Sequence, residues 1–227
     1  MFRNYLKIAL RNLKKYKFYS FINIAGLAIG MACCILILLW VQDEISYDRF
    51  HEQSDNICRV IVENHSTDQA YDQWQTPGPL AFALKEEFPE IVKSTRYHKN
   101  PNEVLIRYKD TKFMEAGLAM ADPDLFEIFT FSFVKGDPKR ALPDHMSVVI
   151  TEEIAEKYFG REDPIGKTLN MSKELNFTVT GVIKKLPPNS RFQFDFLIPA
   201  EVIKEKPSQL KHLKIDLVAY HIDSRIA

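Results

Sequence analysis

The sequence predicts the α+β fold class, with a single N-terminal transmembrane helix followed by a mixed α/β extracytoplasmic domain. Two observations predict the helix: residues 1–20 carry six basic and no acidic side chains, and residues 21–42 carry no charge. A third predicts the domain, because short helical patterns are interspersed with strand patterns. We therefore expect a cytoplasmic basic segment (1–20), a transmembrane helix (21–42), the domain (43–200) and an unassigned tail (201–227).

The first twenty residues are typical of a helix that lies along the inner membrane surface. Apolar residues recur at helical spacing from Phe2 to Leu13, with basic residues between them. Anionic headgroups would attract such a basic face. The predicted membrane-surface cations are Arg3, Lys7, Arg11, Lys14, Lys15 and Lys17.

The uncharged block contains a run, Phe21–Val41, that is long enough to cross a bilayer. At about 1.5 Å of rise per residue, a helix of this length spans roughly 30 Å. A buried core helix is usually shorter and seldom follows six cations. A cleaved signal peptide would end its shorter apolar run in small side chains, whereas this run ends in Leu38-Leu39-Trp40. We therefore expect an uncleaved anchor with its N-terminus in the cytoplasm.

Small residues inside the anchor predict a place for helix packing. Gly26 and Gly30 form a GxxxG pair, a spacing that lets a second helix approach closely in lipid. The same spacing is also common in membrane helices by chance. The pair is the candidate contact with another transmembrane helix.

Strand patterns recur through the rest of the chain. The first strand includes Cys58, which we expect to be a small buried residue. The last two are joined by LPPNS (186–190), which reads as a turn. The predicted strands are ICRVIVEN (57–64), EVLIRYK (103–109), MSVVI (146–150), NFTVTGVI (176–183) and RFQFDFLI (191–198).

Three helices are predicted between these strands. PGPLAFALKEEFPEI (77–91) places Leu80, Leu84 and Phe88 on one face. DPDLFEIF (122–129) is a short helix with Asp122 as its N-cap. TEEIAEKYFG (151–160) can be capped by its first residue and closed by its terminal glycine.

The stretch GREDPIGKT, Gly160–Thr168, nearly matches a phosphate-binding loop. That loop needs four residues between its first glycine and Gly-Lys-Ser/Thr, whereas five separate Gly160 from Gly166. One of the five is Pro164, which has no N–H to offer a phosphate. The flanking elements are also reversed, with a helix before and a strand after. We interpret the stretch as a helix end, a turn and a strand start, with no bound nucleotide.

Other chemistries find little support in the sequence. The six histidines show no zinc-like spacing, and we interpret them as solvated loop residues. No G-x-S-x-G motif is present, so no catalytic residue, metal ligand or cofactor site is predicted. Of the 30 basic residues, six precede residue 21, which leaves 24 against 30 acidic residues beyond residue 42. That acidic balance disfavours nucleic acid as a partner.

Four stretches, in order along the chain, resemble one family. NYLKIALRNLKKYKFYSFINIAGLAIGMA (4–32) and ISYDRFHEQSDNICRV (45–60) resemble the N-terminus of MacB/FtsX-type ABC transporter permeases. SVVITEEIAEKYFGREDPIGKTL (147–169) and VTGVIKKLPPNSRFQFDFL (179–197) resemble the periplasmic core domain of the same family. The combination is far more specific than any one of the four.

The resemblance implies a non-enzymatic component of the bacterial inner membrane, single-pass in this chain, with its C-terminal domain in the periplasm. Such permeases couple ATP hydrolysis by a separate nucleotide-binding protein or domain to movement of their periplasmic domain, a process called mechanotransmission. They export peptides, lipoproteins or drug-like molecules. The implied partners are a cytoplasmic ABC-type ATPase, a second permease copy in a homodimer or pair, the lipid membrane and a periplasmic adaptor.

One departure from the family leaves two hypotheses open. Full-length members have three further transmembrane helices, and no second apolar run in this sequence is long enough to be one. The first hypothesis is therefore a truncated permease subunit. The alternative is a stand-alone, single-pass module that binds or senses a ligand in the periplasm.

Overall fold

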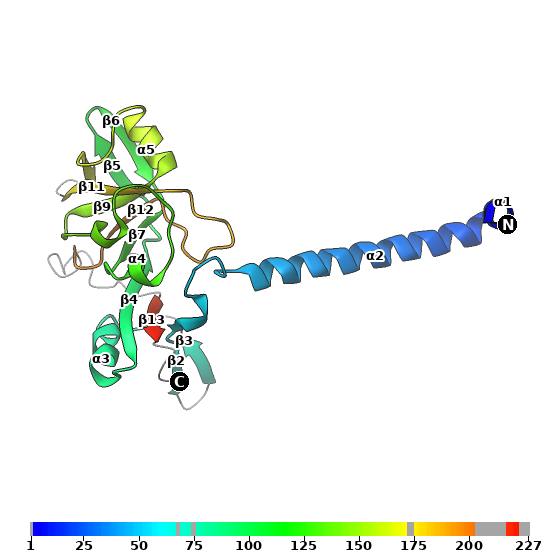
Figure 1. Cartoon of the computed structure of the whole chain (residues 1–227), viewed down its shortest axis with the longest axis horizontal. Coiled ribbons are helices and arrows are strands. Elements are labelled where there is room, and N and C mark those ends of the chain that lie inside the picture. Colours follow the sequence, from blue (N-terminus) through cyan, green and yellow to red (C-terminus); the bar gives the residue numbers. More distant parts are fainter. Residues whose placement is uncertain (1, 67–68, 74–75, 172–174, 203–216, 223–227) are drawn as a thin grey trace. The chain divides into compact units, whose positions relative to one another are not determined.

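The chain divides into a helical unit and a sheet domain. The computed structural model describes residues 2–66, 69–73, 76–171, 175–202 and 217–222. The helical unit is Met1–Tyr47 and the sheet domain is Asp48–Ala227 (Figure 1).

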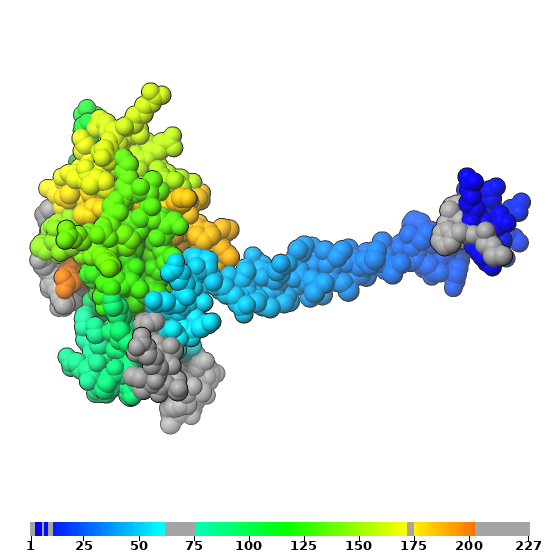
Figure 2. Space-filling model, in the orientation of Figure 1, coloured from blue at the N-terminus to red at the C-terminus, as the bar shows by residue number. Residues whose placement is uncertain are grey.

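The helical unit contains two helices, α1 (Phe2–Lys15) and α2 (Lys17–Ser46). Tyr16 separates them with a non-helical backbone, φ −109° and ψ 55°. Helix α2 has 30 residues, so it is about 45 Å long. Among the described residues it is the one helix long and apolar enough to cross a membrane, and none of its residues is buried (blue in Figure 2).

One mixed sheet organises the sheet domain. Most neighbouring strands are antiparallel, but β11 pairs with β9 and β12 pairs with β7 in parallel, and β8 (Phe133–Lys135) pairs with β11 at the side. The order across the sheet is β1 (Ile57–Arg59), β13 (Leu217–Ile222), β4 (Ile91–Lys99), β7 (Leu118–Ala121), β12 (Phe196–Pro199), β9 (Ser147–Thr151), β11 (Leu175–Ile183), β10 (Thr168–Met171), β5 (Val104–Tyr108) and β6 (Thr111–Glu115).

The remaining elements of the domain are short. A separate hairpin pairs β2 (Val62–Ser66) with β3 (Gln69–Gln73). In Figure 1, α5 lies near β5 and β6 at one end of the domain and α3 lies at the other. The helices are η1 (Ser54–Asn56), α3 (Leu80–Glu87), α4 (Leu125–Ile128), η2 (Pro138–Arg140) and α5 (Glu152–Phe159).

Two core clusters lie on the two faces of the sheet. Along β9, Val148 and Ile150 belong to the cluster that includes residues of α5, whereas Val149 between them belongs to the cluster that includes residues of α4. Neighbouring β12 alternates in the same way, with Phe196 in the α5 cluster and Leu197 in the α4 cluster. Because successive side chains of a strand point to opposite faces, the central strands are buried on both sides.

The predicted strand 191–198 is only half correct. Its second half is β12, but Phe192 and Phe194 lie on the loop before it and pack into the α4 cluster. The loop bends because the amides of Asp195 and Phe196 both donate to the carbonyl of Gly117, at 2.8 and 3.2 Å. The strand also does not form a hairpin with β11, since β9 lies between them.

Several smaller expectations need correction. The predicted strand 57–64 is split into β1 and β2, and Cys58 is exposed. Phe88 follows the end of α3 and is also exposed, so it is not part of a buried face. The carboxylate of Asp122 does not cap α4; it accepts three hydrogen bonds from the backbone and side chain of Arg96, at 2.6–2.9 Å.

Strand β13 lies in the segment to which the sequence pattern assigned no element. It pairs with both β1 and β4, and therefore joins β1 to the rest of the sheet. The other predicted elements appear close to their expected places, including α3, α5, β5, β9 and β11.

Candidate functional site

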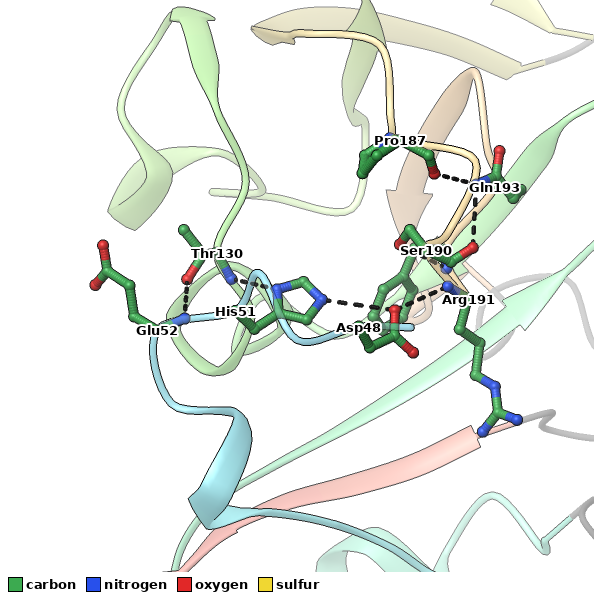
Figure 3. Close-up of polar contacts among 9 residues, drawn as sticks. Asp48, His51, Glu52, Thr130, Pro187, Ser190, Arg191 and Gln193 are labelled. Atoms are coloured by element: carbon green, nitrogen blue, oxygen red, sulfur yellow. Dashed lines mark hydrogen bonds and ion pairs between the residues drawn. The ribbon is translucent and has the colours of Figure 1, made fainter. Parts of the chain in front are cut away.

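The first residues of the sheet domain form an anchored turn. The turn begins at Asp48, directly after the helical unit, and the amide of His51 donates back to the carbonyl of Asp48 at 3.5 Å. It contacts two distant segments, 129–131 and the loop 187–193 (Figure 3). We call these three groups of residues, 48–53, 129–131 and 187–193, the junction.

Asp48 ties the turn to the loop 187–193. Its amide donates to the carbonyl of Asn189 at 3.1 Å, and its carboxylate accepts the amide of Arg191 at 2.9 Å. A carboxylate that accepts a backbone N–H makes a charge-assisted bond, which is stronger than a neutral one. Asp48 also has a positive φ of 56°, a conformation that aspartate tolerates better than most residues. The start of the domain is thus held at two points by one residue.

His51 ties the turn to residues 129–131. Its side chain is only 1% exposed, and its Nδ1 accepts the amide of Thr130 at 3.0 Å. The next residue, Glu52, donates its own amide to the hydroxyl of Thr130 at 3.0 Å. Because Nδ1 accepts a hydrogen, the proton of the neutral ring is assigned to Nε2, which lies 3.9 Å from the Asp48 carboxylate.

Aromatic rings surround the imidazole of His51. The ring centroids of Phe50 and Phe129 lie 4.1 and 5.0 Å from it, and that of Phe192 lies 6.1 Å away. Burial among these rings lowers the pKa of His51, and the charge of Asp48 opposes that shift only in part. The histidine is therefore neutral in the folded domain at neutral pH.

The loop 187–193 is braced by its own hydrogen bonds. The hydroxyl of Ser190 accepts the amide of Phe192 at 3.1 Å, and the side chain of Gln193 donates to the carbonyls of Pro187 and Ser190 at 2.8 and 3.0 Å (Figure 3). Phe192 itself is 1% exposed and packs on Tyr97, with 5.0 Å between the two ring centroids. The turn 48–53 is therefore attached to a loop that is itself fixed by hydrogen bonds and by a buried ring.

The predicted site residues lie on the two helices of the helical unit. Gly26 and Gly30 face open space, since a Cβ added to either would meet nothing within 4 Å. The predicted cations are exposed, five on α1 and Lys17 as the first residue of α2. No group of three or more potential metal ligands occurs in the described part of the chain.

The near-match to a phosphate loop has the arrangement expected from the sequence. Helix α5 ends at Gly160, which has a positive φ of 58°, and strand β10 follows the turn. The amides of Gly166 and Lys167 donate to the carbonyls of Val179 and Pro164, at 2.8 and 3.1 Å. These two donors are therefore not available to a phosphate.

The expectation that the histidines are solvated is wrong for two of them. His51 lies at the junction and His98 lies in β4, and both are buried. A signal was present in the sequence, because His51 follows an aromatic residue within ISYDRFHEQSDNICRV, a stretch that carries the family resemblance. Its partners Thr130 and Phe192 are distant in sequence, and no local pattern identifies them.

Comparisons of the sequence point to one family. A family model described as MacB-like periplasmic core domain matches residues 20–219. The chain is 23% identical over 219 residues to an uncharacterized ABC transporter permease, YvrN, of Bacillus subtilis strain 168. The match covers 89% of this chain and 52% of YvrN, so the chain spans about half the length of that relative.

Solved structures have the same fold as the sheet domain. A domain of a putative permease protein from Porphyromonas gingivalis is 25% identical, with a TM-score of 0.61 over 78% of this chain and 77% of its own. The periplasmic region of MacB from Actinobacillus actinomycetemcomitans is 16% identical, with a TM-score of 0.56 over 76% and 77%. The extracellular domain of the noncanonic ABC-type transporter YknZ from Gram-positive bacteria is also 16% identical, with a TM-score of 0.51 over 74% and 84%.

Proposed function

Because the chain belongs to the family of MacB-like periplasmic core domains, we propose that it acts as a permease subunit of a MacB-type ABC exporter. In this role the junction passes movements of α2 to the sheet domain. ATP hydrolysis by a separate cytoplasmic protein or domain supplies the movement, and the sheet domain acts on the exported molecule. The observation that carries the proposal is the turn 48–53, which is fixed to the domain directly after the helix.

The membrane part of the proposal is supported by α2. Exposed aromatic side chains lie near both ends of its apolar stretch, with Tyr19 at one end and Trp40 at the other. They are 21 positions apart in the sequence, which is about 30 Å along a helix, the thickness of the hydrocarbon core. Aromatic residues favour the two membrane interfaces. The basic α1 then lies on the cytoplasmic surface and the sheet domain on the opposite side of the inner membrane.

The short connection between α2 and the junction supports mechanical coupling. Helix α2 continues to Ser46, and Tyr47 is the one residue before the anchored Asp48. A single extended residue spans at most about 3.6 Å. A larger displacement of the helix must therefore move the sheet domain or break the junction.

The remaining partners follow from the same proposal. Among the described residues, no atom lies within 4 Å of a Cβ added to Gly26 or Gly30, so we assign the two glycines to contact with another transmembrane helix, from a second copy or from the rest of the permease. A cytoplasmic ABC-type ATPase drives the pair, and a periplasmic adaptor receives the peptide, lipoprotein or drug-like substrate. The chain itself performs no catalysis.

Labelling the full chain in lipid nanodiscs tests the coupling. Cys58 is exposed on β1 and can carry a spin label once Cys33 and Cys34 are replaced by serine. We expect the label to tumble at the rate of the disc, because the junction attaches the domain to the helix. A Gly-Ser-Gly insertion between Tyr47 and Asp48 should release the domain and shorten the rotational correlation time.

A matched insertion controls for nonspecific loosening. The same three residues between Lys109 and Asp110, at the tip of the β5–β6 hairpin, should leave the label unaffected. A domain that already tumbles freely in the wild-type chain would contradict mechanotransmission. That result would favour the stand-alone binding or sensor module instead.

A further inference from the structure

We propose that His51 makes the junction an acid-sensitive latch, closed while its imidazole is neutral and released when the imidazole is protonated. The inference rests on the proposed function, because it concerns how tightly the sheet domain is coupled to α2. It adds a condition under which that coupling is lost.

The first argument is the direction of the hydrogen bond at Nδ1. The amide of Thr130 donates to this nitrogen at 3.0 Å, so the nitrogen must carry a lone pair. A second proton on the ring can go only to Nδ1, because Nε2 already holds one. Two N–H groups would then face each other, and the attractive contact would become a repulsive one.

The second argument is the surroundings of the ring. Phe129, Phe131 and Phe192 pack around His51, and segment 129–131 offers it no titratable group. A charged imidazolium in such a place loses its hydration without a full replacement. Protonation is therefore costly as long as the junction stays closed.

Charged groups near the ring do not cancel this cost. Asp48 is the one that faces it, with its carboxylate 3.9 Å from Nε2, but the same oxygen already accepts the amide of Arg191. In Figure 3 the guanidinium of Arg191 points away from the imidazole. Arg49 and Glu52, on the same turn as His51, are exposed. The net result is the lowered pKa of His51, for which burial is the largest cause.

The direction of the pH effect follows from this shift. A histidine whose folded-state pKa is lowered binds fewer protons when folded than when released. The closed junction is therefore fully stable above the ordinary histidine pKa of about 6.5 and loses stability as the pH falls below it. In an acidic medium, the segment 48–53 should detach from Thr130 and loosen the domain from the helix.

Hydrogen exchange of the full chain in nanodiscs tests the latch. Exchange is followed in peptides that cover 48–56 and 129–133, at about pH 7.5 and about pH 5. The exchange times are corrected for the different intrinsic rates of amide exchange at the two pH values. For the wild type we expect protection in both peptides to fall several-fold at the lower pH, because the released imidazole binds a proton more readily than the buried one.

Two variants give the comparison. His51→Asn keeps an acceptor close to the position of Nδ1 but does not titrate, so its protection should not depend on pH. His145→Asn, at an exposed histidine of the same domain, should behave like the wild type. Wild-type protection that is unchanged at pH 5, or an equal loss in His51→Asn, would overturn the proposal.

A measurement without substitution covers the case in which His51→Asn fails to fold. Nitrogen NMR of the wild-type chain reports the titration of the His51 ring, and the Thr130 amide signal should shift at the same midpoint. A Thr130 amide that ignores this titration would also overturn the latch. The Gly-Ser-Gly insertion at neutral pH tests the proposed function separately, so either idea can fail while the other stands.

Discussion

The helical unit and the sheet domain treat their apolar side chains in opposite ways. Helix α2 buries none of its residues and exposes nearly all of its large apolar side chains, for example Ile29 at 65% and Leu36 at 65%. The sheet domain buries rings such as Phe177 and Phe196 completely, in two clusters that share the central strands. The domain can therefore be stable on its own, whereas α2 depends on lipid or on another helix for every apolar contact. Substitutions in the sheet domain should therefore change its stability, whereas substitutions in α2 should change association with another helix.

The largest expected effect is the loss of a core ring at the junction. Phe192→Ala removes a side chain that packs on Phe129 and Tyr97, and should reduce the free energy of unfolding of the sheet domain by about 4 kcal/mol. Leu36→Ala, in the exposed α2, should leave it unchanged. Denaturant unfolding of the full chain in nanodiscs, followed by circular dichroism, measures both. Similar losses in the two variants would mean that the regions are not independent.

A buried ion pair should give the next largest effect. Asp122→Ala removes the partner of Arg96, whose side chain is 9% exposed, and leaves a buried charge unpaired. We expect a loss of about 3 kcal/mol in the same unfolding measurement. Asp124→Ala is the matched control, since it breaks a partly exposed contact with Lys85 at 3.8 Å and should cost under about 1 kcal/mol. Equal losses would show that burial does not set the cost.

Substitution of Asp195 should have a smaller effect on stability, and that effect should be a gain at neutral pH instead of a loss. Burial raises the pKa of this carboxyl, and the charges of Glu115 and Glu153 add to the shift. A raised folded-state pKa means that stability falls as the pH rises through the window above the ordinary value of 3.8. Asp195→Asn should therefore raise the melting temperature at neutral pH, and the gain should vanish below about pH 4. A gain that persists in acid, or one matched by exposed Asp110→Asn, would contradict this account.

The smallest effect on the fold is expected in the membrane helix. A Cβ added at Gly30 meets no atom within 4 Å, so Gly30→Leu should leave the melting temperature of the sheet domain unchanged. It should nevertheless weaken association of the chain with a second copy, measured by energy transfer between labelled chains in liposomes, because a bulky residue blocks close approach. Ala28→Leu, on the other side of the helix, should have little influence. Unchanged association would remove the packing role of the glycines.

Local patterns predicted most of the secondary structure, because they depend on neighbours in the sequence. The end of α5 at Gly160 and the strand after it follow from glycine, proline and helical spacing alone. The amides of Gly166 and Lys167 in that turn donate to backbone carbonyls, which agrees with the interpretation of the stretch as a turn.

The elements that could not be predicted depend on distant partners. The loop before β12 is bent by the carbonyl of Gly117, which lies 78 residues before Asp195 in the sequence. Strand β13 exists through its pairing with β1 and β4. His51 is buried by Phe129 and Phe192, which are distant in sequence, so the polar residues of its own turn did not predict its burial.

Helix α2 ends at Ser46, with one residue before the anchored Asp48, so its length also decides a direction within the helical unit. Each residue of an α-helix turns its neighbours by about 100°, so the face that carries Gly26 and Gly30 has a direction, relative to the end of the helix, that depends on the number of residues between them and Ser46. One helical residue added before Tyr47 would turn this glycine face by about 100° relative to the helix end, whereas seven added residues would return it to within about 20°. Length variants of α2 would therefore change the direction of the glycine face in steps of about 100°.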